Sequence, residues 1–375
     1  RGAGRLRPRR NVAAVAACVI GLLGGRPAQA ETYDVLPFGD VVLLPVRIGK
    51  ETHRFVFDTG ASVSVFDRTL VDGEPVGRFD LQTAGGPLTV ERFPTPRALL
   101  EDEPLTAAAA APAIDLEGFR RAAGLPIRGG VGMDWAAGRI VRIDFDRGTL
   151  EVLDAVPPDA GDPFPLSFKA GAPYVMAEVP ALGAVEFLVD TGSVGAATID
   201  AAAFDRLLAA EKLVSVVRAE TVTPHGTAPT TVARLESLRL GRFETRNLWL
   251  QRRESGPPSL GLDYWARFSV TFDFPRGRLF LKPGRFFDKQ DRRTSAGLRM
   301  RTQGGALVVL AVEPDGPADR AGLAAGDVLV SFGDRSIAGL PAGALDRRLS
   351  VPDSTVDVRP RRGTTEFEVR LRLPP

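Results

Sequence analysis

A short sequence occurs twice in this chain, and this repeat limits the possible folds more than any other feature. Asp58-Thr59-Gly60 is followed by Asp190-Thr191-Gly192 after 190 − 58 = 132 residues. Two further pairs of matching segments keep the same order with an offset of 129: Gly132 to Trp135 with Gly261 to Tyr264, and Asp144 to Gly148 with Asp273 to Gly277. Three matches in one order predict two homologous lobes of about 125 residues each, a usual domain size.

The local pattern within each lobe is mainly that of β-strands. Short apolar or β-branched runs bounded by turn residues predict strands, namely 41–48, 54–57, 139–145 and 149–153. Two stretches predict short helices, 116–123 and 201–213, the second with apolar residues at helical spacing. Residues 107–112, rich in Ala and ending in Pro, are interpreted as a connection, and residues 154–163 as the linker between the lobes.

The first thirty residues have the three-part layout of a secretory signal peptide. Arg5, Arg7, Arg9 and Arg10 precede an apolar run from Val12 to Leu23, and Ala28-Gln29-Ala30 has the small-x-small form of a cleavage site. The run is short for a membrane span, so an uncleaved anchor is the less favoured alternative. A lipoprotein signal around Cys18 is a further alternative, although this Cys lies within the apolar run. A periplasmic or secreted location, with no stable membrane span after cleavage, follows as an expectation.

Composition removes several classes of function. The 48 basic and 46 acidic residues give a net charge of +2, which does not favour a nucleic-acid-binding protein. Cys18, the only cysteine, falls in the predicted signal peptide, so the mature chain has no thiol for a disulfide, a nucleophile or a metal site. The two histidines, His53 and His225, are expected at the surface and supply too few ligands for a metal cluster. No metal or organic cofactor is implied, and carboxylates are left as the reactive groups.

The repeated Asp-Thr-Gly unit has a chemical interpretation. Glycine permits a tight turn that presents the preceding aspartate, and threonine can bond to backbone of an opposed loop. Two such loops related by a pseudo-two-fold axis would bring Asp58 and Asp190 together. Adjacent carboxylates share one proton over a wide pH range, so one could activate water while the other polarises a peptide carbonyl.

On these residues the chain resembles the retropepsin-like aspartic proteases over both lobes, roughly residues 33–283. The resemblance implies that Asp58 and Asp190 are catalytic, and that the catalytic loops are supported by Thr59, Gly60, Thr191, Gly192 and Ser193. It also implies that Val131-Gly132 and Leu260-Gly261 pass beneath those loops, although Gly130 and Ser259 stand where the family often has an apolar residue. Hairpin flaps over a cleft are expected, with candidate tips at residues 83–87 and 223–227, and plain surface hairpins are the equal alternative.

The two motifs differ at the next residue, which is Ala61 in the first and Ser193 in the second. We hypothesise that Ser193 donates a hydrogen bond to the Asp190 carboxylate and favours its ionised form, leaving Asp58 as the more readily protonated partner.

The last segment, from residue 295 to 373, resembles a bacterial PDZ domain. A strand at 306–312 precedes Gly316-Pro317-Ala318, a predicted short helix at 317–321, and Gly326-Asp327-Val328. The resemblance implies that a peptide adds a strand beside the segment after Ala296-Gly297-Leu298 and that backbone amides of this loop bind a terminal carboxylate. Gly297, Leu298 and Met300 are therefore the expected peptide-binding residues. A domain that packs on the lobes and binds nothing is the alternative.

Together these features predict a mainly β chain with two pseudo-symmetric retropepsin-like lobes and a C-terminal PDZ-like α/β domain. The expected divisions are a signal peptide at 1–30, lobes at 31–158 and 159–290, and the PDZ-like domain at 291–375. The predicted function is an exported aspartic endopeptidase that acts on polypeptides, with C-terminal peptide tails bound at the PDZ domain. The alternative is a catalytically weak, chaperone-like peptide-binding protein that uses the same cleft and groove.

Overall fold

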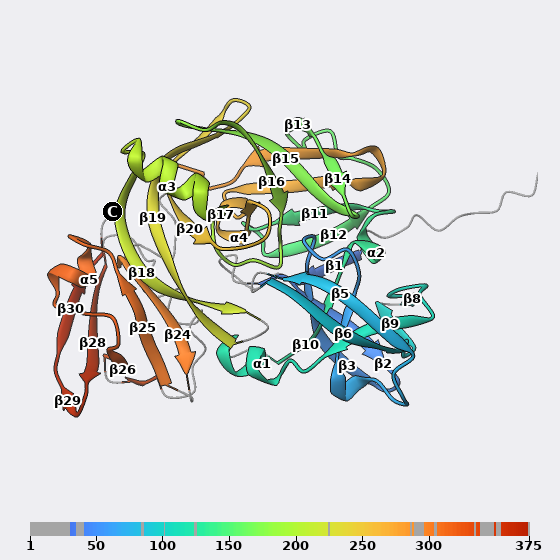
Figure 1. Cartoon of the computed structure of the whole chain (residues 1–375), viewed down its shortest axis with the longest axis horizontal. Helices are drawn as coiled ribbons and strands as arrows, with labels where there is room; N and C mark the ends of the chain where they lie inside the picture. The colour runs from blue at the N-terminus through green and yellow to red at the C-terminus, as the bar shows by residue number, and fades with distance from the viewer. Residues whose placement is uncertain are drawn as a thin grey trace, which may run out of the picture.

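The computed structural model describes most of the chain, and its secondary structure is mainly β, as the sequence predicts (Figure 1). The described residues are 31–34, 41–83, 86–100, 102–123, 126–223, 226–285, 287–288, 296–303, 306–333, 335–337, 349 and 354–373. The predicted signal peptide, Cys18 and His225 lie outside these residues.

The first repeat forms one large sheet. Its order in the described residues is β5 (Gly77–Thr83), β6 (Gly86–Pro94), β9 (Ala110–Ile114), β4 (Val65–Asp67), β10 (Ile127–Val131), β3 (Glu51–Phe57), β2 (Leu43–Ile48), β7 (Ala98–Leu100) and β8 (Glu103–Pro104). Three short helical segments accompany it: η2 (Arg68–Leu70), α1 (Glu117–Ala123) and α2 (Met133–Ala136).

The second repeat forms a corresponding sheet. Its order is β14 (Ser167–Lys169), β15 (Ala172–Val179), β16 (Gly183–Val189), β21 (Ser259–Leu260), β17 (Ala197–Asp200), β20 (Phe243–Arg253), β19 (Gly226–Leu240) and β18 (Leu213–Thr223). Its helices are α3 (Ala201–Ala209) and α4 (Leu262–Trp265). The strand before each Asp-Thr-Gly motif, β3 or β16, pairs in parallel with a later strand, β10 or β21. That later strand also pairs antiparallel with the strand after the motif, so the repeat in sequence is a repeat in topology.

A further sheet takes strands from both repeats and joins them. Its order is β1 (Glu31–Asp34), β12 (Thr149–Leu153), β11 (Ile140–Asp144), β22 (Phe268–Asp273), β23 (Arg278–Pro283) and β13 (Asp162–Pro165), with η3 (Phe274–Arg276) after β22. The central pair, β11 and β22, is antiparallel, with Ile143 opposite Val270. Both side chains are fully buried in one core cluster that contains residues of both repeats, so the lobes share a hydrophobic core.

The C-terminal segment has its own sheet and core. The described strands run β24 (Leu298–Gln303), β25 (Ala306–Val312), β26 (Val328–Phe332), β28 (Thr355–Arg362) and β29 (Thr365–Glu366), while β27 (Arg335–Ser336) and β30 (Val369–Arg372) pair with β26 and β28. The predicted short helix is present as α5 (Pro317–Arg320). Leu298, Leu307 and Leu371 belong to a separate hydrophobic cluster, as expected for a domain with its own core.

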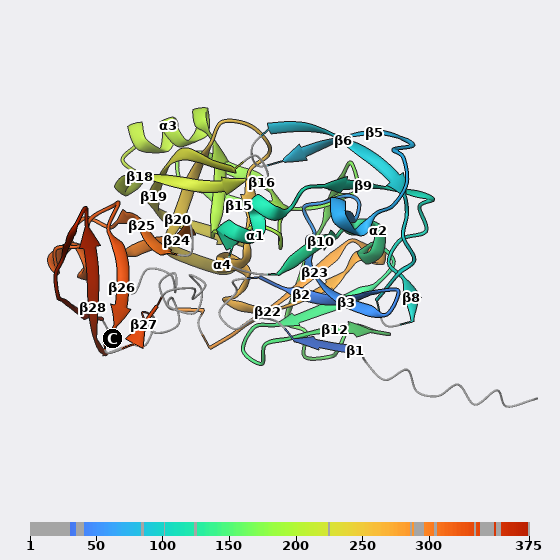
Figure 2. The same cartoon turned by 90° about the horizontal axis from the view of Figure 1, so that it is seen from below.

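The C-terminal sheet is fixed to the second lobe by a buried ion pair. Arg234 of β19 donates from Nε and Nη2 to the two carboxylate oxygens of Glu313, at 2.8 and 2.9 Å. Its guanidinium lies 4.5 Å from the centroid of the Trp249 ring, and Trp249, Val232 and Ala311 form a small apolar cluster at the same place. Helix α1 of the first lobe lies beside β24, the edge strand of the C-terminal sheet (Figures 1 and 2).

Three expectations about local structure are wrong. The predicted helix 201–213 ends at Ala209 because Glu211 adopts a positive φ of 57° and Leu213 begins β18. The alanine-rich connection is partly strand β9, which pairs with both β4 and β6. His53, expected at the surface, has a side chain that is only 11% exposed, with its Nε2 atom 3.6 Å from Glu51.

Candidate active site

The two Asp-Thr-Gly loops meet at the junction of the lobes through reciprocal hydrogen bonds of their threonines. The Thr59 amide donates to Thr191 Oγ1 at 3.0 Å, and the Thr191 amide donates to Thr59 Oγ1 at 3.1 Å. Each hydroxyl donates in turn to backbone of the other lobe, Thr59 to Val189 O at 2.5 Å and Thr191 to Phe57 O at 2.8 Å. Both threonines are fully buried, so these bonds hold the loops in one relative position.

This arrangement places Asp58 and Asp190 against each other. A Cβ atom at Gly60 would lie 2.9 Å from Asp190 Oδ1 and 3.2 Å from Asp58 Oδ1, so both carboxylates border the same glycine. A Cβ atom at Gly192 would overlap the Asp58 carboxyl group. Glycine is therefore required at both positions because any side chain would occupy the space between the acids.

Each Asp-Thr-Gly loop is hydrogen-bonded to the strand that passes beneath it. The Asp58 amide donates to Val131 O at 2.9 Å in β10, and the Asp190 amide donates to Leu260 O at 3.0 Å in β21. The glycine after each of these residues begins a short helix, α2 or α4. The polar Ser259, which stands at an often apolar position, is accommodated by a 2.8 Å hydrogen bond between its hydroxyl and that of Thr198.

The two carboxyl groups have different electrostatic environments. Burial, and then the charge of Asp190, raise the pKa of Asp58 to about 7. Although Asp58 as a residue keeps some exposure, its carboxyl group is enclosed by both loops, and this enclosure governs its pKa. Burial also raises the pKa of Asp190, and the positive charge of Arg253 offsets part of this increase. The pair thus favours one proton and one negative charge near neutral pH.

The bond that the structure records between Ser193 and Asp190 is not the one that sequence reasoning proposed. The donor is the backbone amide of Ser193, 3.1 Å from Asp190 Oδ1. In the first motif the amide of Gly60 donates to Asp58 Oδ1 at 2.9 Å. The difference between the acids is better explained by Arg253, a residue that sequence reasoning missed. Its only signal in the sequence was an arginine that follows the apolar run Leu248-Trp249-Leu250 of β20.

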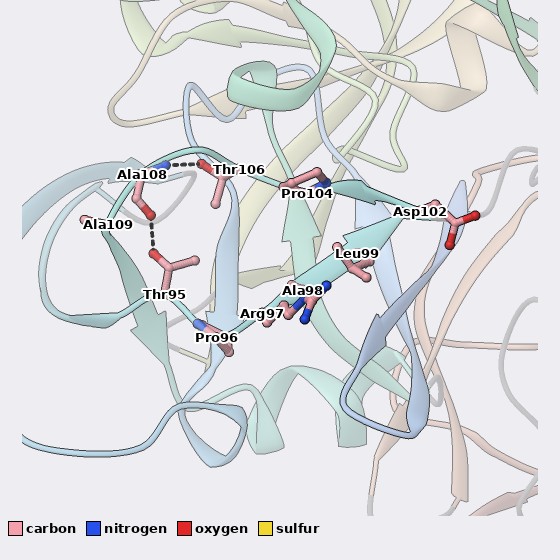
Figure 3. A pocket seen from close by; sticks show the side chains of 10 residues that line it. All are labelled: Thr95, Pro96, Arg97, Ala98, Leu99, Asp102, Pro104, Thr106, Ala108 and Ala109. Carbon is pink, nitrogen blue, oxygen red and sulfur yellow. Dashed lines mark hydrogen bonds between the residues drawn. The ribbon is translucent and has the colours of Figure 1, made fainter.

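Both candidate flaps are β-hairpins in the structure. The described residues show the strand pairing of each hairpin and do not include the residues at its tip. Strands β5 and β6 pair from Gly77 with Arg92 to Thr83 with Gly86. Strands β18 and β19 pair up to Thr223 with Gly226. Away from this tip, Arg234 of β19 binds Glu313 of the C-terminal segment. A separate surface pocket lies in the first lobe between β7, β8 and the segment before β9, and neither Asp58 nor Asp190 lines it (Figure 3).

The expected peptide-binding residues lie together at one corner of the C-terminal sheet. Gly297 has a φ of 67°, and its carbonyl accepts a hydrogen bond from the Glu313 amide at 2.6 Å. Leu298 is 2% exposed and packs in the domain core, so any ligand contact there would come from its backbone. Met300 is partly buried against the same core.

No group of three or more His, Cys, Asp or Glu side chains suited to a metal ion occurs in the part of the chain that the structure describes. Within the same residues, no helix has the length and apolar character needed to cross a membrane.

A family model for the PDZ domain matches residues 308–355, so the C-terminal segment contains a PDZ domain. No curated protein matches the chain significantly. Similar solved structures include an aspartic proteinase from Irpex lacteus, with 15% identity and a TM-score of 0.47, covering 70% of this chain and 100% of that one.

Two other matches each cover about a fifth of the chain. The photosystem II D1 C-terminal processing protease is 30% identical with a TM-score of 0.19, over 20% of this chain and 22% of that protein's length. An aminopeptidase N family protein from Idiomarina loihiensis is 25% identical with a TM-score of 0.19, over 21% of this chain and 13% of that one. None of these TM-scores reaches 0.5, so these likenesses do not define the activity of this chain.

Proposed function

We propose that this chain is an aspartic endopeptidase of the retropepsin-like kind, with Asp58 and Asp190 as its catalytic residues. The observation that carries the proposal is the pair of opposed Asp-Thr-Gly loops, locked by the reciprocal bonds of Thr59 and Thr191 with both carboxylates against Gly60. A purely structural turn would not need two glycines that leave room for two adjacent acids.

The proposed reaction uses the single proton of the pair. The ionised Asp190 takes a proton from a water molecule while the oxygen of that water attacks the peptide carbonyl carbon. Asp58, protonated, gives its proton to the carbonyl oxygen, which yields a neutral tetrahedral diol. Collapse of the diol breaks the C–N bond, the amine nitrogen takes the proton held by Asp190, and one hydroxyl returns its proton to Asp58. This is general acid–base hydrolysis with no covalent intermediate and no cofactor.

We assign extended polypeptides as substrates and C-terminal peptide tails as ligands of the PDZ domain. The edge strand β24 follows the loop at Gly297, which suits the addition of a peptide strand. Helix α1 lies beside this strand, so a bound tail would have to share or displace that contact. The location that we propose is the periplasm or the extracellular space, on the basis of the signal-like residues 1–30.

Cleavage of an unfolded protein tests the catalytic proposal. Residues 31–375 are incubated with reduced casein at several pH values, beside the Asp58→Asn and Asp190→Asn variants. We expect cleavage by the wild type that falls by roughly 1000-fold in each variant. Asp134→Asn is not a neutral control because Asp134 accepts hydrogen bonds from Ser64. Asp72→Asn, which changes an exposed loop carboxylate, is suitable.

Each outcome is informative. Cleavage that persists in either aspartate variant contradicts the proposed mechanism. A wild type that binds casein without cutting it at any pH would instead support the peptide-binding alternative. For the PDZ proposal, a peptide with a free C-terminus should compete with a tail-bearing substrate, and its amidated form should not. Equal competition by both peptides would contradict recognition of a terminal carboxylate.

A further inference from the structure

Arg253 is a buried cation for which the structure provides no ion-pair partner among the described residues. The residue is 9% exposed. Its Nη1 atom donates to Pro257 O at 3.1 Å, and none of the ion pairs found among the described residues includes its guanidinium. Removal of an unpaired charge from water costs several kcal/mol, so such a cation is expected to act on a nearby negative group.

The negative group that acts on Arg253 is the candidate catalytic Asp190. The charge of Arg253 lowers the pKa of Asp190, and the charge of Asp190 opposes the lowering of the Arg253 pKa by burial. Asp58 and Arg253 are the charged side chains that act on Asp190, together with the backbone amides of Gly192 and Ser193. For Asp58 the charged group is Asp190, and no cation contributes among the described residues.

Arg253 belongs to the structural unit that carries the Asp190 loop. It ends β20, where it lies opposite Asp200 of β17, the strand that follows the loop. The guanidinium donates to the carbonyl of Pro257. The carbonyl of the next residue, Pro258, accepts a hydrogen bond from the amide of Leu188, two residues before Asp190. The guanidinium is thus held by the same segment that supports the strand leading into the loop.

The corresponding position in the first lobe is apolar. Strand β9 pairs in parallel with β4 after the first motif, and Ile114 lies opposite Asp67 there. Asp67 and Asp200 are themselves equivalent, since each begins a short helical segment by accepting a backbone N–H bond. Ile114 therefore stands where the second lobe has Arg253. The first lobe does place Arg120 beside Asp67, but this arginine forms an ion pair with the Asp67 carboxylate. A buried arginine without a carboxylate partner among the described residues is therefore present at this position in the second lobe and not in the first.

We propose that Arg253 is a positioning residue that holds the negative charge of the aspartate pair on Asp190 and so leaves the shared proton on Asp58. This inference rests on the proposed function, because the roles of the two acids matter only if they hydrolyse peptides. It assigns the water-activating role to Asp190 and the carbonyl-polarising role to Asp58. The cause is a single buried charge that breaks the symmetry of the two loops.

The test follows each carboxyl group directly. The protein is labelled with ¹³C in aspartate, the Asp58 and Asp190 signals are assigned with the two Asn variants, and their shifts are recorded against pH. Replacement Arg253→Gln should raise the titration midpoint of Asp190 by roughly one pH unit, a tenfold change in its ionised fraction. Arg253→Lys should keep most of the wild-type midpoint because it retains the charge.

Two further variants protect the test against misfolding and general charge effects. Arg252→Gln removes the neighbouring arginine, which pairs with Asp205 at 3.4 Å, and should leave both midpoints unchanged. Ile114→Lys places a cation at the equivalent site of the first lobe and should lower the Asp58 midpoint, which is about 7 in the wild type. This variant tests the same reasoning even if Arg253→Gln does not fold.

Unchanged midpoints in both Arg253→Gln and Ile114→Lys would overturn the inference, as would an Asp190 shift of equal size in Arg252→Gln. Because the titration of the carboxyl groups needs no catalytic turnover, a failure of the proposed peptidase function can be told apart from a failure of the inference about Arg253. If the protein cleaves nothing but its Asp190 midpoint shifts as expected, the peptidase proposal is wrong and the effect of Arg253 on Asp190 is confirmed. In an active enzyme, the acidic limb of kcat/KM against pH should move upward with the Asp190 midpoint in Arg253→Gln and remain in place in Arg253→Lys.

Discussion

Replacement of Asp58 by asparagine is expected to stabilise the lobes at neutral pH and to do so less as the pH falls. Folding raises the pKa of this carboxyl from 3.8 to about 7, because the ionised form is buried beside Asp190. Between those values the folded protein binds more protons than the unfolded protein, so the stability contributed by protonated Asp58 is present at low pH and is lost as the pH rises toward 7.

The size of the effect follows from the displacement of the pKa. Each unit corresponds to about 1.4 kcal/mol, so a displacement of about three units gives at most about 4 kcal/mol between pH 4 and pH 7.5. Asparagine cannot ionise, and its side-chain oxygen can still accept from the Gly60 amide. The free energy of unfolding of Asp58→Asn should therefore exceed that of the wild type by an amount that grows with pH, by about 1.4 kcal/mol per unit at the steepest point.

Urea unfolding followed by tryptophan fluorescence measures this difference, and Trp249 also senses the contact of the second lobe with Ala311 of the C-terminal sheet. Trp135, Trp249 and Trp265 are the three tryptophans of the chain, and all precede the PDZ domain. Asp72→Asn, which removes an exposed carboxylate, serves as the control and should follow the wild type. A difference between Asp58→Asn and the wild type that stays constant within about 0.5 kcal/mol from pH 4 to pH 7.5 would refute the reasoning.

Three further predictions concern the loops and the domain contact. Thr191→Val removes a bond from the Thr59 amide and a bond to backbone, so the unfolding free energy should fall by about 2–4 kcal/mol and casein cleavage by roughly tenfold or more, with Thr52→Val, at an exposed position of β3, as the comparison. Gly192→Ala should abolish cleavage with an unchanged circular dichroism spectrum, because its methyl group meets the Asp58 carboxyl; an active variant would contradict the geometry. Glu313→Gln removes the negative charge that the buried Arg234 guanidinium contacts, so calorimetry should show a loss of about 3 kcal/mol in the free energy of unfolding; an unchanged profile would show that this ion pair does not stabilise the contact between the second lobe and the C-terminal sheet.

The local chemistry of the motifs was predictable from the sequence because it depends on short-range properties. Short apolar or β-branched runs bounded by turn residues identified the strands, and Asp146 to Gly148 identified a turn between β11 and β12. Errors arose where tertiary pairing overrides composition. Residues 110–114 are rich in alanine and include Pro112, yet they form β9 because β4 and β6 offer backbone partners on both sides.

The sequence by itself determined the two candidate acids, the threonines and glycines beside them, and the presence of a PDZ-like segment, because each follows from a motif of a few residues. Only the tertiary structure decided that Thr59 and Thr191 bond each other across 132 residues, that Arg234 binds Glu313, and that Arg253 acts on Asp190 where the first lobe has Ile114. Electrostatic and hydrogen-bonding partners depend on distance in space, and separation along the chain does not reveal that distance.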